Sequence, residues 1–283
     1  ERYIMEINKL IKERTTEVEE EISQMSQTQA MTAVWGNEST ELADLLEDHP
    51  TTIQIAANIG LGKSTTTNII GKFGGSKTLF EDLENPVLSL YYDDKATYTE
   101  RLQLDVINQR LYSILLAKGD YPNQSLIFDR TPYEDPLVFI PSLTEEGHMT
   151  KEKHDYCQKY FQMKKQQIEN NSRKKLGKKG LDPDLIIILQ ASEENGWKRV
   201  LAREREMEVR EDADKGKGLT REFYHSLHTK YENFANALRE HYTGPILTLN
   251  QDSPELGDST NTKGQLYTVK SVKEALKIIY KPE

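Results

Sequence analysis

Short apolar segments alternate with longer segments of helical periodicity through most of the chain. The apolar segments predict strands at 51–57 (TTIQIAA), 77–82 (KTLFED), 124–130 (QSLIFDR), 184–192 (DLIIILQAS) and 245–252 (PILTLNQD). Apolar positions three to four apart predict helices over 97–118, 150–173 and 219–240. Strands that alternate with helices indicate an α/β fold, in which a five-stranded parallel sheet is flanked by helices on both faces.

The two ends of the chain carry helical patterns of their own. Residues 1–30 have apolar side chains at helical spacing, and 37–48 predicts a further short helix. Nothing in this region resembles catalytic chemistry, so we expect a helical N-terminal extension over 1–50, packed on the core or on a partner chain. One domain over 51–283 follows it. The segments 170–180 and 251–265 read as polar loops, and SVKEALKIIY predicts the last helix.

Composition and charge narrow the classes of partner. The 283 residues are 36% hydrophobic and 29% charged, as in a soluble globular protein. A net charge of −9 argues against non-specific binding to nucleic acid, so an anion must be bound at a local basic site. No apolar run reaches the length of a membrane span, and Cys157 as the single cysteine rules out an intrachain disulfide. We therefore expect a cytoplasmic protein that binds neither nucleic acid nor membrane.

The stretch IQIAANIGLGKSTTTNII (53–70) has the pattern of a phosphate-binding loop. Gly60 and Gly62 would form the turn, Lys63 would reach the β- and γ-phosphates, and Ser64 would ligate Mg²⁺. The helix that begins there favours an anion at its N-terminus. Ala57 occupies the position of the usual first glycine. Alanine is tolerated there only if its φ angle is negative.

Two further stretches offer charge at the carboxyl ends of strands, where open α/β sheets bind ligands. IFDR (127–130) presents Asp129, which could hold Mg²⁺, and Arg130, which could neutralise a transferring phosphoryl group. A surface ion pair is the alternative. RVLAREREME (199–208) places three arginines within two helical turns. They suit a lid over phosphates, although such a run also fits a solvated helix with Glu–Arg pairs.

Taken in order, these stretches resemble the deoxyribonucleoside kinase family, most closely its bacterial deoxyadenosine/deoxyguanosine kinase type. The resemblance covers about residues 52–282 and rests on ANIGLGKST (57–65), LFEDLENPVLSLYY (79–92), LQLDVINQR (102–110), FDRTPYEDPLVF (128–139), PDLIIILQAS (183–192) and RVLARERE (199–206). It implies a P-loop kinase fold, ATP and Mg²⁺ as cofactors, and a homodimer. Ala57 and the extension depart from the family pattern.

The resemblance also implies roles for individual residues. ATP and its phosphates would be bound by Asn58, Gly60, Gly62, Lys63, Ser64, Thr65, Arg199, Arg203 and Arg205, and Mg²⁺ by Ser64 and Asp129. The nucleoside would be bound by Tyr92, Gln103, Arg110, Asp135 and Glu208. Lys63 and Arg130 would be catalytic, with Glu81 as general base on the 5′-hydroxyl. Since this chain has Asp82 where the family has proline, Asp82 is the substitute candidate.

Three functions remain open on these residues. The first is ATP-dependent phosphorylation of the 5′-hydroxyl of a deoxyribonucleoside in nucleotide salvage, with a purine favoured. The second is an inactive nucleotide-binding relative that serves as a subunit or sensor, which Ala57 and the extension would suit. The third, a nucleoside monophosphate kinase, needs an extra basic site for the acceptor phosphate. Glu81, Tyr92 and Glu208 suit a neutral sugar better.

Overall fold

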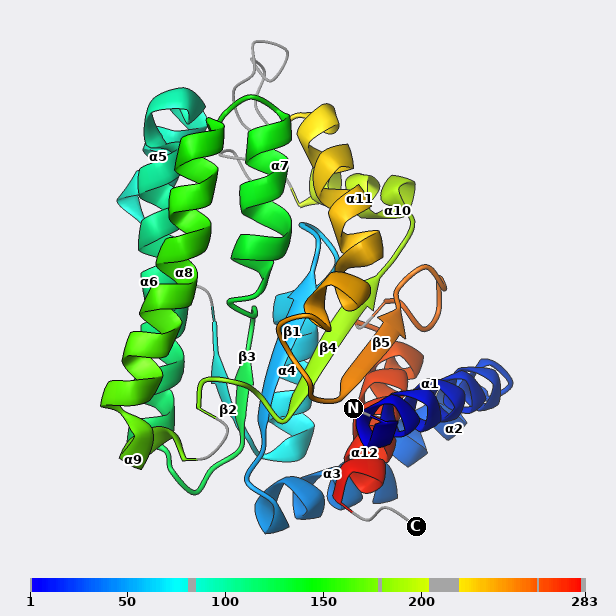
Figure 1. Cartoon of the computed structure of the whole chain (residues 1–283). Coiled ribbons are helices and arrows are strands. Elements are labelled where there is room, and N and C mark those ends of the chain that lie inside the picture. Colours follow the sequence, from blue (N-terminus) through cyan, green and yellow to red (C-terminus); the bar gives the residue numbers. More distant parts are fainter. Residues whose placement is uncertain (1, 81–84, 178–179, 204–218, 259, 281–283) are drawn as a thin grey trace.

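Five parallel strands form one sheet in the computed structural model, with helices on both faces (Figure 1). The structure describes residues 2–80, 85–177, 180–203, 219–258 and 260–280. The strand order is β2-β3-β1-β4-β5. The strands are β1 (Thr52–Ala57), β2 (Lys77–Leu79), β3 (Leu126–Phe128), β4 (Leu185–Gln190) and β5 (Ile246–Asn250). The predicted α/β class and all five strands are confirmed.

Helices account for most of the remaining chain. They are α1 (Arg2–Ser23), α2 (Gln27–Val34), α3 (Asn37–Asp48), α4 (Lys63–Gly74), α5 (Pro86–Asp93), α6 (Lys95–Asp120), the π-helix η1 (Asp135–Phe139), α7 (Ile140–Glu145), α8 (Lys151–Asn171), α9 (Arg173–Leu176), α10 (Glu193–Ala202), α11 (Arg221–Leu238) and α12 (Thr262–Tyr280). Helices α6, α8 and α11 fall where the sequence predicts helices. None of the helices in the described ranges is long and apolar enough to cross a membrane.

Alternating side chains of the central strands divide the core into two halves. On β1, Ile53, Ile55 and Ala57 face a core built with α1–α4 and α12. Ala56 faces the opposite core, to which α6, α8 and α11 contribute. Strand β4 is apolar on both faces, as expected for a strand with a helical layer on each side. The sheet is therefore a rigid central layer.

The N-terminal helices pack directly on α12. Val18 and Ile22 of α1 are fully buried in the core that they share with Val269 and Val272. Ion pairs add to this contact: Lys273 pairs with Glu38 and Glu41, and Lys270 pairs with Glu21. Burial lowers the pKa of Lys273, but the hydrogen bonds that its ammonium group donates to Glu38 and Glu41 outweigh burial and raise this pKa overall. This cation is therefore held in its charged form against α3.

The predicted loop over 251–265 is wrong at its end, because α12 begins at Thr262. Polar residues and Gly264 give the first turn a loop-like composition. The Asn261 side chain accepts a hydrogen bond from the Gly264 N–H at 2.8 Å, and a Cβ at Gly264 would lie 2.2 Å from the Asp258 carbonyl. A capping side chain and a close backbone approach thus start this helix where composition predicts a loop.

Replacement of Ile22 by Ala tests whether the extension and the sheet unfold together. Ile22 is 0% exposed between α1 and the core, so we expect Ile22→Ala to lower the free energy of unfolding by about 2–5 kcal/mol. Urea denaturation of the variant should show a single transition, with its midpoint at a lower urea concentration than that of the wild type. Met5→Ala, at an exposed position of the same helix, should change the free energy by less than about 0.5 kcal/mol. A separate early transition would show that α1 unfolds independently.

Candidate active site

The phosphate loop leaves the carboxyl end of β1 and leads into α4. Gly60 and Gly62 have positive φ angles of 84° and 81°. At Gly60 a Cβ would lie 2.8 Å from Cγ2 of Val200 and 3.1 Å from the Gly196 carbonyl, so only glycine fits. Gly62 precedes the first turn of α4, whose N–H groups face the loop. The geometry is that of an anion site at a helix N-terminus.

Ala57 does not disturb this loop. It is the last residue of β1, and Arg130 is the only non-glycine residue with positive φ in the described part of the chain. The Ala57 methyl group lies in the core below the sheet, where it is fully buried. Its carbonyl accepts a hydrogen bond from Lys63 Nζ at 2.9 Å. The φ angle of Ala57 is therefore negative, so alanine is tolerated at this position of the phosphate loop.

Ser64 and Asp129 bring a hydroxyl and a carboxylate together at the entrance of the loop. Ser64 Oγ donates to Asp129 Oδ2 at 2.5 Å, and Asp129 Oδ1 is buried with no hydrogen-bond partner in the described part of the chain. Hard oxygen ligands of this kind suit Mg²⁺ when phosphates complete the coordination. Among the described residues no cluster of three or more His, Cys, Asp or Glu could hold a metal. The residues present fit a Mg²⁺ ion that arrives with a nucleotide.

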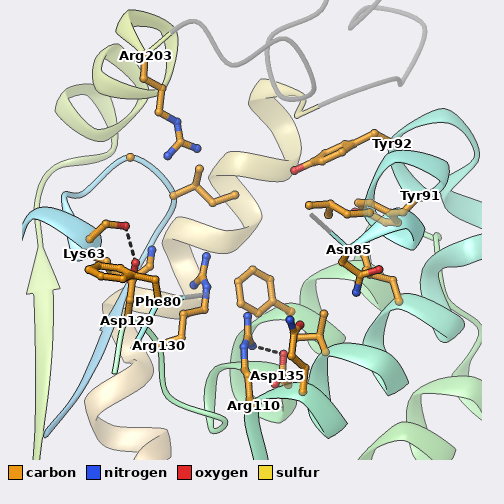
Figure 2. Close-up of a pocket in the computed structure, with 18 of the residues that line it drawn as sticks. Lys63, Phe80, Asn85, Tyr91, Tyr92, Arg110, Asp129, Arg130, Asp135 and Arg203 are labelled. Atoms are coloured by element: carbon orange, nitrogen blue, oxygen red, sulfur yellow. Dashed lines mark hydrogen bonds and ion pairs between the residues drawn. The ribbon is translucent and has the colours of Figure 1, made fainter. Parts of the chain in front are cut away.

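A single cavity of about 790 Å³ joins the phosphate loop to the predicted nucleoside site. Predicted site residues that line it are Gly60, Gly62, Lys63, Ser64, Thr65, Tyr92, Gln103, Arg110, Asp129, Arg130, Asp135, Arg199 and Arg203. Figure 2 shows Lys63, Asp129 and Arg203 on one side, and Tyr92, Arg110 and Asp135 on the other. Asn58 is the exception: it is fully buried, and its side chain accepts the Ile59 N–H at 2.8 Å.

The side opposite the phosphate loop combines an ion pair, an amide and an aromatic ring. Arg110 donates to Asp135, and both are almost fully buried. Gln103 lies on the same face of α6 as Arg110, seven residues away, and its Oε1 is buried without a hydrogen-bond partner from the described ranges. The ring of Phe139 lies 5.6 Å from the Arg110 guanidinium and 5.1 Å from that of Arg130. Planar and hydrogen-bonding groups thus surround a space that a flat ring could fill.

The π-helix η1 (Asp135–Phe139) brings Phe139, which is absent from the predicted site residues, to the cavity beside the predicted Asp135. Asp135 and Phe139 are its two ends, and the Ile140 N–H reaches the Asp135 carbonyl five residues back. This wider turn lets both side chains line the cavity. Phe139 was not singled out, although it ends the motif FDRTPYEDPLVF. Nor was Glu134 of the same motif, which is fully buried and pairs with Arg130.

Some predicted site residues lie outside the described residues. They are Glu81, its substitute Asp82, and the predicted phosphate and sugar ligands Arg205 and Glu208. Phe80, which immediately precedes Glu81, lines the cavity. Arg203, the last described residue after α10, also lines it. Arg199 lines the cavity and donates to the Gln251 carbonyl at 2.7 Å, so it also ties α10 to the loop before α12.

The parallel sheet, the glycine turn and the Lys-Ser pair at the start of α4 define a P-loop kinase fold. Residues 53–276 match the deoxynucleoside kinase family, and the protein belongs to that family. The match begins after the extension.

Relatives and solved structures agree with this assignment. The chain is 33% identical over 159 residues to a deoxyguanosine kinase of Lactobacillus acidophilus. The aligned residues make up 56% of this chain and 65% of that relative. The chain is 28% identical over 214 residues to a deoxyadenosine/deoxycytidine kinase of Bacillus subtilis. The aligned residues make up 74% of this chain and 87% of that relative. A deoxyadenosine kinase from M. mycoides with products dCMP and dCDP bound has the same fold, with a TM-score of 0.54 and 23% identity over 76% of this chain and 94% of that one.

Lys95 is a buried amine directly behind the cavity wall. It is 6% exposed, and its Nζ has no hydrogen-bond partner among the residues that the structure describes. The Nζ lies 5.9 Å from the ring of Phe223, which lines the cavity. Burial lowers the pKa of Lys95, against the weaker opposing influence of Glu146. His148 packs edge-on against the same ring, and burial lowers its pKa too, with a further contribution from Lys95.

A Lys95→Met exchange should stabilise the fold. Methionine keeps the packing and removes a buried cation without a partner, so we expect a gain of about 1–3 kcal/mol in the free energy of unfolding at pH 7. Because the pKa of Lys95 is lower in the folded state, the unfolded chain binds more protons. Wild-type stability therefore rises, relative to the variant, as pH increases towards the unfolded pKa of 10.5.

Chemical denaturation of both proteins between pH 7 and pH 10 measures this difference. The difference between their free energies of unfolding should become steadily smaller as the pH rises. Lys72→Met, on the surface helix face beside Trp35, provides the control and should show no such trend. A variant less stable than wild type at pH 7 would contradict the assignment of Lys95 as an uncompensated buried charge.

Proposed function

We propose that this protein transfers the γ-phosphoryl group of ATP to the 5′-hydroxyl of a purine deoxyribonucleoside, as a step of nucleotide salvage. One observation carries the proposal. A single continuous cavity has a phosphate loop on one side and the Gln103, Arg110 and Asp135 side chains on the other. Donor phosphates and an acceptor nucleoside bound on these two sides would meet between them, which is the arrangement that phosphoryl transfer requires.

The phosphate side would bind and neutralise the donor. N–H groups of the loop and of the first turn of α4 would hold the phosphates, with Lys63 moving from the Ala57 carbonyl to a phosphate oxygen. Ser64 and Asp129 would hold Mg²⁺, which supplies charge neutralisation at the phosphates when bound. Arg130 and Arg203 line the same space and would stabilise the charge that develops on the transferred group.

Proton removal from the 5′-hydroxyl is assigned to Glu81. Strand β2 runs parallel to β3, and the Asp129 N–H donates to the Leu79 carbonyl at 2.9 Å. The chain therefore leaves β2 beside Asp129, and Phe80 already lines the cavity. An acid one residue further on is close in sequence to the point where a general base must act. Asp82 remains the substitute candidate.

The acceptor side suits a neutral nucleoside. Arg110 is the cation among the described lining residues of that side, and its charge is balanced by Asp135. A nucleotide acceptor would need additional positive charge for its own phosphate. The Gln103 amide can pair with donor and acceptor atoms along a base edge, as glutamine does with adenine. Relatives named as deoxyguanosine and deoxyadenosine kinases support a purine. Tyr92 and Glu208 are assigned to the sugar.

Phosphoryl transfer from labelled ATP–Mg²⁺ tests this function directly. Acceptors would be deoxyadenosine, deoxyguanosine, deoxycytidine, thymidine and the matching monophosphates. We expect a labelled monophosphate from a purine deoxynucleoside, with kcat/KM at least about fivefold above that for thymidine, because one mismatched base contact is worth at least about 1 kcal/mol. No labelled diphosphate should form from the monophosphates.

Glu81→Gln is the matched control for this assay. It should lower kcat by about 10²–10⁴-fold, the usual contribution of a general base, and leave the Kd of ATP nearly unchanged. Turnover that survives in Glu81→Gln would move the base to Asp82. Wild-type protein that binds ATP and phosphorylates none of the acceptors would overturn the proposed function.

We also propose a homodimer formed through the outer face of α6 and α8. This face carries exposed apolar side chains at Tyr112, Leu116, Tyr156 and Met163. The two helices lie side by side (Figure 1), and Lys164 Nζ lies 5.3 Å from the ring of Tyr112. Apolar side chains that span two adjacent helices are typical of a surface that a second copy covers.

Analytical ultracentrifugation of the wild type should give twice the mass of one chain. Leu116→Glu should shift the protein to the monomer, because a carboxylate would be buried in the interface. Met31→Glu replaces an equally exposed apolar residue on α2 and should leave the dimer intact. Equal masses for the wild type and Leu116→Glu would exclude this interface.

A further inference from the structure

Glu134 is a buried carboxylate that joins three parts of the active site without lining the cavity. It is 0% exposed. Its Oε1 accepts hydrogen bonds from the Ala57 N–H at 3.2 Å, from Arg130 at 3.0 Å and from the Tyr231 hydroxyl. Its Oε2 accepts the Thr131 N–H at 3.0 Å. One side chain therefore contacts the end of β1, the turn after β3 and helix α11.

Burial of this charge requires the compensation that these contacts supply. A carboxylate removed from water is stable only when a cation and several donors replace its hydration. Arg130 provides the cation, and two backbone N–H groups and a hydroxyl provide further donors. Burial, followed by the charge of Glu134, raises the pKa of Tyr231 well above its ordinary value, so its hydroxyl remains a donor. Both oxygen atoms of the carboxylate therefore have hydrogen-bond donors in place.

The backbone of Arg130 needs such support. Its φ angle of 149° lies in a region that residues with side chains rarely occupy. Glu134 binds this residue at both ends, since Oε2 holds the next peptide N–H and Oε1 holds the guanidinium. Phe139 lies 5.1 Å from the other side of the guanidinium. The same carboxylate thus fixes the strained turn and the direction of the arginine side chain.

The hydrogen bond between Glu134 and the Ala57 N–H fixes the position of Arg130 relative to the phosphate loop. Ala57 is the residue from which the loop starts, and its N–H and the Arg130 guanidinium share one oxygen atom of Glu134. A movement of the turn after β3 therefore changes the position of both groups together. Arg130 lines the cavity beside Asp129, where the transferred phosphoryl group would lie.

We propose that Glu134 is a positioning residue for phosphoryl transfer, which holds the guanidinium of Arg130 in a fixed relation to the phosphate loop. The inference rests on the proposed function. Glu134 does not touch the substrate, so its effect appears in the rate of transfer rather than in binding. Misplacement of a catalytic group by about 1 Å is enough to lower a rate by about a hundredfold.

Glu134→Gln is the direct test, because the amide keeps the shape and one acceptor oxygen but removes the charge. In the purine deoxynucleoside assay we expect kcat to fall by about a hundredfold, with the nucleoside KM and the Kd of ATP within about threefold of wild type. Glu274→Gln is the control. It removes the charge of a half-buried carboxylate on α12 that pairs with Arg14 of α1 and with Lys273, away from the cavity, and should leave kcat unchanged.

Chemical rescue separates positioning from simple destabilisation. In Arg130→Ala, guanidinium ion added at millimolar concentration should restore part of kcat by binding beside Glu134. The double variant Arg130→Ala/Glu134→Gln should show no such rescue. Equal rescue in the two proteins would overturn the proposal, because it would show that the carboxylate does not hold the guanidinium.

The experiments distinguish a failure of the Glu134 proposal from a failure of the proposed function. If folded Glu134→Gln keeps kcat within about threefold of wild type, the inference is wrong while the proposed function stands. If Glu134→Gln does not fold, Glu134→Asp decides in its place: a shorter carboxylate should lower kcat at least about tenfold with ATP affinity retained, and an unchanged kcat would refute the proposal. Wild-type protein without transfer to any acceptor would instead refute the proposed function.

Discussion

The parallel pairing of β1 with β3 is the constraint on which the active site depends. Gln54 lies opposite Phe128 in this register, so the phosphate loop and the Asp129–Arg130 turn leave the sheet at the same edge. The Thr131 hydroxyl donates to the Gln54 side-chain oxygen at 2.8 Å. This buried side-chain hydrogen bond joins β1 to the turn after β3 and supports the same register. Because β4 pairs with the other side of β1, neither strand can shift without moving the hydrogen-bond ladder of its neighbour.

Charge in the site is held by pairs that form at this edge. Asp129 meets Ser64, Asp135 meets Arg110, and Glu134 meets Arg130. Pairs of this kind add little net stability, since desolvation offsets most of their attraction. Their value lies in orientation, because dipoles and charges already in place need no rearrangement when charge moves during the reaction. Lys95, without such a partner, lies behind the wall rather than in the cavity.

Sequence patterns predict the parts of this site that depend on local rules. The five strands, the glycine turn and the cluster of Gln103, Arg110 and Asp135 follow from periodicity and from family motifs. What they miss has a non-local cause. Glu134 lies within the quoted motif FDRTPYEDPLVF, but its partners Ala57 and Tyr231 are 77 and 97 positions away in the sequence, so local patterns do not reveal these contacts. Phe139 reaches the cavity only because η1 is a π-helix, which periodicity of 3.6 does not predict.

Two departures from the family pattern, Ala57 and the N-terminal extension, lie on the same face of the sheet. Ala57 directs its methyl group into the core that α1–α3 share with α12, and the extension packs on that core as well. Two residues that line the cavity, Tyr92 and Phe223, belong to the core on the other face. The sheet separates these two layers, and its register is fixed by β3 and β4 rather than by either helical layer. Changes in the first layer therefore alter packing and stability, while the cavity is lined by the strand ends and by helices of the other layer, among them α5, α6 and α11.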